Sequence, residues 1–122
     1  MIKIFLVDDQ PSIRKGLQMQ MALESDFLVV GETGDGLSAL RRIAELEPDV
    51  VILDIDMPGM DGFDILQALR QMEIGSPVIV LSIQADPVSR QRAFDLGAAD
   101  FIEKQAGGTE LFAAIRQVAG WS

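Results

Sequence analysis

The sequence predicts an α/β fold in which five parallel strands alternate with five helices in a three-layer sandwich. Short runs of Val, Ile, Leu and Phe occur without polar alternation, as expected for strands buried on both faces of a sheet. Between these runs, apolar residues recur at helical spacing. The regular alternation of the two patterns favours a doubly wound parallel sheet with right-handed crossovers.

The predicted strands are apolar runs, and four of them end at polar residues. They cover residues 2–7, 27–30, 50–53, 78–81 and 101–103. Asp8-Asp9 follow the first run, Asp54 the third, Ser82 the fourth and Lys104 the fifth. Ligands of open α/β sheets bind beyond the carboxyl ends of the strands. We therefore expect three carboxylates, a hydroxyl and an ammonium group to converge on one crevice.

The predicted helices lie between the strands and carry one apolar face each. In chain order these faces are Ile13, Leu17 and Met21; Leu37, Leu40, Ile43 and Ala44; Ile65, Leu66, Leu69 and Met72; Val88, Ala93, Phe94 and Leu96; and Leu111, Phe112, Ile115 and Val118. The fourth helix has the weakest apolar stripe. We expect it to be the most mobile helix of the five.

Residues typical of helix ends and turns support this division. Pro11 and Pro87 fit a first helical turn, where a missing N–H is tolerated. Asp61 and Asp86 are suitable N-caps. Met57-Pro58-Gly59 is typical of a turn between the third strand and the next helix.

Length and composition fit a single domain spanning residues 1–122, of which 48% are hydrophobic. The chain has no cysteine and therefore suits a reducing compartment, so we expect a cytoplasmic protein. No apolar run is long enough to span a membrane. A formal net charge of -9 argues against direct contact with nucleic acid. The absence of histidine leaves oxygen atoms as metal ligands, which favours Mg²⁺ or Mn²⁺.

The converging residues suggest phosphoryl chemistry. Carboxylates crowded at one edge repel one another, and a divalent cation relieves that repulsion. Such a cation, together with Lys104 and the hydroxyl of Ser82, forms a receptor for a tetrahedral phosphoryl group. Asp54 follows the middle strand and is the natural nucleophile. Each residue alone has a simpler explanation, since Asp8 or Asp9 can cap a helix and Ser82 and Lys104 are ordinary strand-end residues.

The strings LVDDQP, VILDIDMPGMDG, VIVLS and GAADFIEK closely resemble the receiver domain of bacterial two-component response regulators. The resemblance runs from about Ile2 to about Ala119. It implies a flavodoxin-like fold with strand order 2-1-3-4-5, and a sensor histidine kinase as phosphoryl donor to Asp54. It further implies that Mg²⁺ is held by Asp8, Asp9, Asp54 and the main-chain carbonyl of Asp56. Ser82 and Lys104 would contact the phosphoryl oxygens.

The resemblance also implies a switch, in which Ser82 moves toward the phosphoryl group and Phe101 turns inward. The surface of the fourth helix, fifth strand and fifth helix would shift in response. Such a protein is a signalling phosphoacceptor that catalyses only its own phosphorylation and dephosphorylation. The stretch KQAGGTELFAAIRQVAG resembles the NarL/LuxR-type subgroup, whose C-terminal helix-turn-helix domain controls transcription. That DNA-binding domain, lying outside this chain, and a second copy in a homodimer are the other expected partners.

Three positions depart from the family pattern. Ile83 stands where Ala or Gly is usual, and its bulk, with the neighbouring Gln84, is expected to modulate access to Asp54. Gln105 replaces a common proline, so the cis bond often found there is not expected. Phe101 replaces the commoner tyrosine and lacks a phenolic hydrogen bond.

Three alternatives compete with the receiver. Asp54-Ile55-Asp56 resembles the nucleophile and acid pair of haloacid-dehalogenase-type phosphohydrolases, although the chain is short for one and lacks a later acidic pair at a strand end. A flavin carrier of the same topology needs a glycine- and hydroxyl-rich loop after the first strand, which DDQPS does not provide. A receiver-like interaction module that is not phosphorylated stays open because of Ile83.

Overall fold

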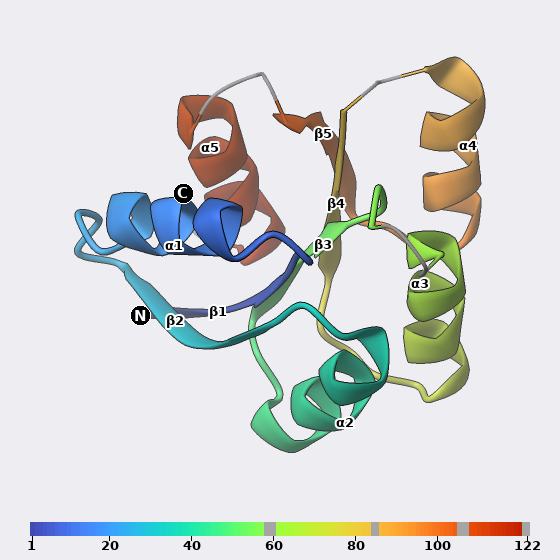
Figure 1. Ribbon diagram of the computed structural model, residues 1–122, viewed down its shortest axis with the longest axis horizontal. Helices are drawn as coiled ribbons and strands as arrows, with labels where there is room; N and C mark the ends of the chain where they lie inside the picture. Colours follow the sequence, from blue (N-terminus) through green and yellow to red (C-terminus); the bar gives the residue numbers. More distant parts are fainter. Residues whose placement is uncertain (58–60, 84–85, 105–107, 121–122) are drawn as a thin grey trace.

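Five parallel strands form one sheet in the order β2-β1-β3-β4-β5, which confirms the predicted order (Figure 1). The computed structural model describes residues 1–57, 61–83, 86–104 and 108–120. The strands are β1 (Ile2–Val7), β2 (Phe27–Thr33), β3 (Val50–Asp54), β4 (Val78–Ser82) and β5 (Asp100–Glu103). β2 extends three residues beyond the predicted run. It is an edge strand paired with β1 along its length, so polar residues are tolerated there.

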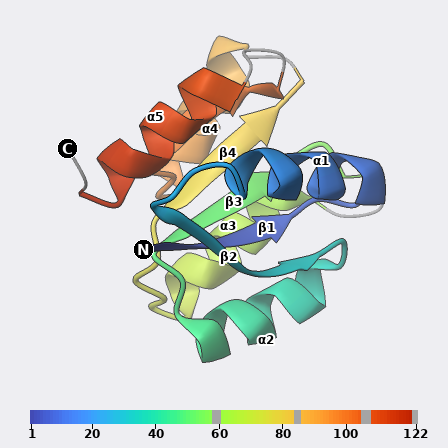
Figure 2. The same ribbon diagram turned by 90° about the vertical axis from the view of Figure 1, so that its left-hand side faces the viewer.

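Five helices cover the two faces of the sheet. They are α1 (Pro11–Met21), α2 (Gly36–Leu46), α3 (Gly62–Gln71), α4 (Pro87–Asp95) and α5 (Gly108–Val118). α1 and α5 lie on one face, and α2, α3 and α4 lie on the other (Figures 1 and 2). Within the described ranges, no helix has the length and apolar character needed to cross a bilayer.

The core consists of two apolar clusters, one on each face of the sheet. Alternate strand residues supply them: Phe5 and Leu53 pack toward α2, α3 and α4, whereas Ile4 and Ile52 pack toward α1 and α5. Because both faces are covered, every residue of β3 and β4 is buried. This explains the absence of polar alternation in the sequence.

The apolar face of α2 differs from the predicted one. Leu37 is 77% exposed and Ala44 is exposed, so neither belongs to the core as predicted. Gly36, Ala39 and Ile43 are buried instead. Leu37 and Ala44 each follow a buried residue and are rotated from it by about 100°, away from the sheet. The predicted stripe was therefore displaced by one residue at these two positions.

α4 is held by few buried apolar residues, as predicted. Ala93 is its buried residue, while Val88 is 78% exposed and Phe94 lies at the surface. Leu96, just beyond the helix, is partly buried against the core. The predicted weakness of the α4 packing stripe is thus confirmed, whereas its mobility stays a prediction.

Side-chain caps fix the starts of several helices. Asp61 Oδ1 accepts a hydrogen bond from the Phe63 N–H (2.9 Å), and Asp86 Oδ1 accepts one from the Ser89 N–H (2.8 Å), as predicted. Asp35 caps α2 in the same way, which the sequence analysis did not identify. The predicted turn at Met57 continues into Pro58 and Gly59, which lie outside the described residues.

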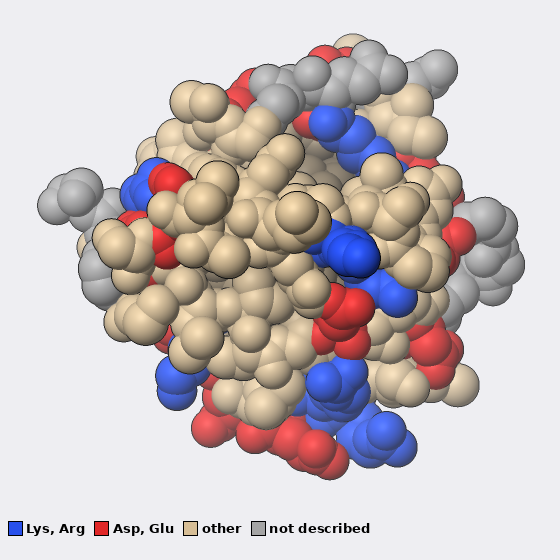
Figure 3. Space-filling model, turned by 60° about the vertical axis from the view of Figure 1, so that its left-hand side comes forward, with Lys and Arg blue, Asp and Glu red and all other residues tan. Residues whose placement is uncertain are grey.

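Charged residues are unevenly distributed over the surface. Figure 3 shows the side that carries α1, where uncharged residues cover a broad area and a row of basic and acidic side chains runs beside it, close to the centre of the view. The chain as a whole carries a formal net charge of -9.

Candidate functional site

The predicted polar residues meet at the carboxyl edge of the sheet. Asp54 is the last residue of β3 and Ser82 the last of β4, while Asp8 directly follows β1 and Lys104 directly follows β5. β3 lies between β1 and β4, so Asp54 has the acidic pair on one side and Ser82 on the other. The parallel register therefore assembles the site that the strand ends predicted.

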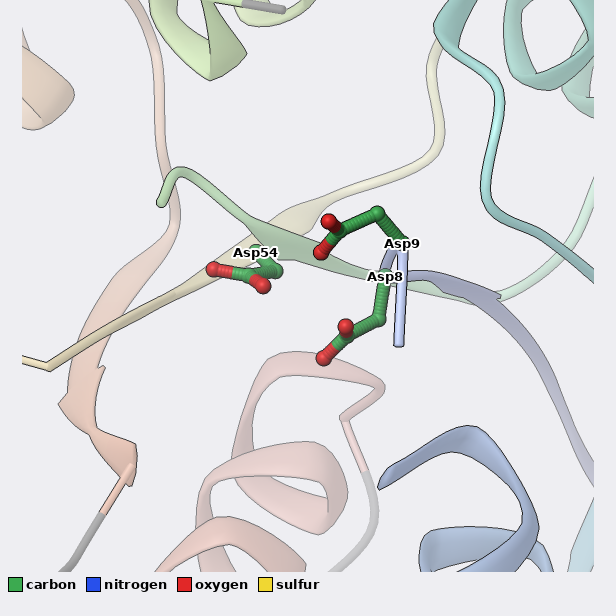
Figure 4. A group of neighbouring side chains, drawn as sticks. All are labelled: Asp8, Asp9 and Asp54. Atoms are coloured by element: carbon green, nitrogen blue, oxygen red, sulfur yellow. The ribbon is translucent and has the colours of Figure 1, made fainter. Parts of the chain in front are cut away.

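Three carboxylates form a cluster at this edge. Asp8, Asp9 and Asp54 each offer an oxygen atom, and these atoms lie within 4.8 Å of one another. Figure 4 shows the carboxylates of Asp8 and Asp9 on the side of Asp54 and reaching toward it. Asp8 is 3% and Asp54 is 1% exposed, whereas Asp9 is half-buried. Negative charge is thus concentrated in a space with little water.

The environment of Asp8 fits a bound cation. Burial raises the pKa of Asp8 above its ordinary value of 3.8, and the charges of Asp54 and Asp9 add to this effect. The Gln10 N–H and Lys104 act in the opposite direction. Within the described part of the chain, Asp8 Oδ2 is a buried oxygen without a hydrogen-bond partner. An unsatisfied carboxylate oxygen among other carboxylates is a suitable ligand for a hard divalent cation.

Asp54 is held by two donors. Lys104 Nζ lies 2.7 Å from Asp54 Oδ2, and the lysine side chain is only 19% exposed. The Asp56 N–H donates to Asp54 Oδ1 at 2.8 Å. Both oxygens are therefore oriented by neighbours, and a strong positive charge stands beside the carboxylate in a partly dry environment.

The loop after β4 is tied to the loop after β3. The Ile83 N–H donates to Asp56 Oδ2 at 2.6 Å, and both residues lie at the surface. Ser82, one residue earlier, is buried. The Ile83 side chain is 51% exposed, and its predicted influence on access to Asp54 stays a prediction. Gln84, predicted to act with it, and Gln105 lie outside the described residues.

Phe101 lies in the core of this structure. Its side chain is 3% exposed and belongs to the cluster beneath α3 and α4. The guanidinium of Arg90 on α4 lies 5.9 Å from the centre of the ring, and its Nη1 donates to the Phe101 carbonyl at 3.3 Å. The aromatic ring is therefore already inward. Movement of Phe101 during switching stays a prediction.

Two residues that support the acidic pair were missed by the sequence analysis. Arg14 donates from Nη1 to the Asp8 carbonyl and from Nε to Glu32 at 3.2 Å. Gly34 lies so close that a Cβ atom there would stand 3.2 Å from Asp9 Cα and 3.3 Å from the Asp8 carbonyl oxygen. The position of Arg14 shortly after the acidic pair was the available signal for that residue. No local pattern distinguishes Gly34 from other glycines.

The sequence matches the response regulator receiver domain family over residues 4–116. It is 39% identical over 116 residues to the transcriptional regulatory protein KdpE of Mycobacterium tuberculosis, covering 95% of this chain and 50% of that protein. This chain belongs to the response regulator receiver domain family. The predicted family is thereby confirmed. Receiver domains of response regulators are signalling proteins, and the chain spans about half the length of the curated relatives it matches.

Solved structures confirm the flavodoxin-like fold. The signal receiver domain of a response regulator named NarL from Mycobacterium tuberculosis superimposes with a TM-score of 0.90 at 35% identity, covering 98% of this chain and 96% of that one. A DNA-binding response regulator of the LuxR family from Staphylococcus aureus gives a TM-score of 0.89 at 29% identity, covering 98% of this chain and 99% of that one. The chain thus resembles receivers of the predicted NarL/LuxR type.

Proposed function

We propose that Asp54 accepts a phosphoryl group from a phosphohistidine of a sensor histidine kinase, and that residues 1–122 form a single receiver domain for this purpose. One observation carries the proposal: the buried Asp54 carboxylate is paired with Lys104 at 2.7 Å and borders two further carboxylates. A carboxylate held between a fixed ammonium and a cation-binding cluster suits nucleophilic attack on phosphorus.

The transfer needs positioning and charge neutralisation rather than acid-base catalysis. An Asp54 oxygen attacks the phosphorus, so that the P–O bond forms as the P–N bond to the histidine breaks. The imidazole keeps the bonding electron pair and takes up a proton from water. Lys104 then pairs with the phosphoryl oxygens, and the Ser82 hydroxyl donates to one of them.

Mg²⁺ or Mn²⁺ is the proposed cofactor. Asp8, Asp9 and Asp54 would hold it together with the main-chain carbonyl of Asp56. Asp8 Oδ2, which has no hydrogen-bond partner among the residues that the structure describes, and the crowding of the three carboxylates support this assignment. When bound, the cation neutralises charge on the phosphoryl oxygens and on the carboxylates at once.

We propose that the output is control of transcription, through a DNA-binding domain outside this chain. The relative KdpE is named a transcriptional regulatory protein, and this chain covers half of it. Phosphorylation would act through Ser82 and Phe101 on the surface of α4, β5 and α5. We further propose a cytoplasmic location, with the sensor kinase as one partner and, on phosphorylation, a second copy of the chain as another. The receiver would catalyse no reaction beyond its own phosphorylation and dephosphorylation.

Mass spectrometry of the intact protein tests this function. After incubation with acetyl phosphate and Mg²⁺, the wild type should gain one phosphoryl group, and Asp54→Asn should gain none. Asp64→Asn, which removes an exposed carboxylate from the first turn of α3, is the matched control and should be labelled like the wild type.

Three results would contradict or redirect the proposal. Label that persists in Asp54→Asn would exclude Asp54 as the acceptor. A wild type that stays unlabelled even with its kinase would favour the non-phosphorylated interaction module. Sustained turnover of a phosphate ester would favour the hydrolase. In the same assay, an Ile83→Ala rate equal to that of the wild type would exclude Ile83 as a determinant of access.

A further inference from the structure

The Asp56 side chain makes a contact that the proposed transfer does not use. Its carboxylate accepts a hydrogen bond from the main-chain N–H of Ile83, 27 residues away, at 2.6 Å. The main-chain N–H of Asp56 donates to the acceptor carboxylate of Asp54 at 2.8 Å. Asp56 therefore connects Asp54 with the residue that follows Ser82.

We propose that, in the unphosphorylated protein, the Asp56 carboxylate binds the Ile83 N–H in place of a phosphoryl oxygen. When Asp54 is phosphorylated, the phosphoryl group replaces Asp56 as the acceptor of this hydrogen bond. Asp56 is therefore a positioning residue for the switch. This inference rests on the proposed function. A main-chain N–H at the rim of the site binds an anionic oxygen without discriminating among its sources. Here the protein supplies that oxygen itself.

The contact lies where a phosphoryl group would arrive. Asp54 and Ser82 end neighbouring strands, and Ile83 immediately follows Ser82. A phosphoryl group on Asp54 brings up to about two negative charges to this edge. The Asp56 carboxylate is then repelled by a like charge, and the Ile83 N–H gains a competing acceptor. Both effects favour release of Asp56 from Ile83.

The surroundings allow the Asp56 side chain to move. A cavity of about 310 Å³ is lined by Asp56, Ser82 and Ile83, together with Ile55, Phe63, Asp86 and Ser89. Asp56 is exposed, so its side chain can rotate without repacking the core. Ile83 lies on the segment that leads into α4, a helix whose one buried residue is Ala93. An exchange of partner at Ile83 is therefore transmitted directly to a weakly held element.

Two variants separate the charge of Asp56 from its shape. Asp56→Asn keeps an acceptor oxygen but removes the charge, and Asp56→Ala removes the acceptor; both keep the main-chain N–H that contacts Asp54. At saturating Mg²⁺, both should be labelled by acetyl phosphate about fivefold faster than the wild type, because a charge-assisted hydrogen bond is no longer displaced. Asp64→Asn, which removes one carboxylate without a contact to Ile83, should keep the wild-type rate.

Nuclear magnetic resonance of the Ile83 amide supplies a readout specific to the contact. In the unphosphorylated wild type its proton should resonate far downfield, and Asp56→Ala should move it upfield. The phosphorylated forms of the two proteins should have similar Ile83 shifts. Three results overturn this inference alone. They are equal labelling rates in the wild type and both Asp56 variants, a labelling rate of Asp64→Asn as high as that of the Asp56 variants, and an Ile83 chemical shift that Asp56→Ala leaves unchanged. Absence of label in the wild type overturns the proposed function as well.

Discussion

Asp8 carries the clearest energetic conflict among the described residues. One of its oxygens accepts from the Gln10 N–H at 2.9 Å, while the other is buried and has no hydrogen-bond partner in the described ranges. The neighbouring carboxylates of Asp9 and Asp54 oppose its ionisation. Asp8 therefore lowers the stability of the cation-free protein. We expect the same carboxylate to stabilise the cation-bound protein, where its Oδ2 atom is a ligand.

Asp8→Asn should stabilise the cation-free protein at pH 7 by roughly 1–2 kcal/mol, because a buried, unsatisfied charge is removed. The pKa of Asp8 is raised by folding, so the stability that protonated Asp8 contributes is fully present below pH 3.8 and is lost as the pH rises through the folded value. The advantage of the variant should therefore shrink toward acid pH. Urea denaturation in EDTA at several pH values measures this difference.

The same variant should respond less to Mg²⁺. The wild type should gain stability with Mg²⁺, and Asp8→Asn should lose most of that gain. Glu45→Gln removes an exposed carboxylate of α2 and should behave like the wild type. An Asp8→Asn variant that is less stable than the wild type in EDTA, or that keeps the full Mg²⁺ response, would contradict the assignment of Asp8 as a cation ligand.

The sequence was sufficient to locate the residues that meet at the site, because each ends or follows a buried strand. It was not sufficient to find Arg14 or the side-chain role of Asp56. Arg14 is recognisable only once α1 is placed beside the Asp8 carbonyl. The Asp56 contact depends on two loops that are 27 residues apart, so no local pattern specifies it.

At the scale of single elements, α4 differs from α5 in how it is attached to the rest of the protein. Ala93 is its buried residue, and polar contacts supply much of the remaining attachment, including the bond from Arg90 to the Phe101 carbonyl. α5, in contrast, buries Leu111, Ala114 and Ile115. Few buried apolar contacts allow a segment to open at low free energy.

Amide hydrogen exchange should therefore be faster in α4 than in α5. The comparison is made in the unphosphorylated protein, where the two helices share the same global stability and differ only in local opening. Mass-spectrometric exchange on peptides covering residues 87–95 and 108–118 measures it. Equal protection of the two helices would show that the sparse apolar packing of α4 does not make it mobile.

Element boundaries were predictable to different degrees for physical reasons. β3 and β4 are buried on both faces, so their apolar runs predict the position of both strands. β2 lies at the edge of the sheet, and its last residues are polar yet paired with β1. The face of α2 was misplaced at Leu37 and Ala44 because helical spacing alone admits two neighbouring stripes.

At the scale of the whole molecule, the parallel topology unites residues from distant parts of the chain. β1 lies next to β3 on one side, and β4 and β5 follow on the other side of β3. Asp8, just after β1, and Lys104, just after β5, therefore approach Asp54 at the end of β3. The acidic excess of the chain adds to the repulsion at this edge and to the advantage of a bound cation. The fold therefore predicts one acceptor carboxylate, located where the sheet is central and the neutralising groups converge.

Chemical mapping of the phosphorylated residue tests this claim most directly. Borohydride reduces an aspartyl phosphate to homoserine, and peptide sequencing by tandem mass spectrometry then locates the changed residue. After labelling with acetyl phosphate and Mg²⁺, homoserine should be found at position 54, and labelling in EDTA should yield almost none. Homoserine at Asp8, Asp9 or Asp56, or equal labelling with and without Mg²⁺, would contradict the account.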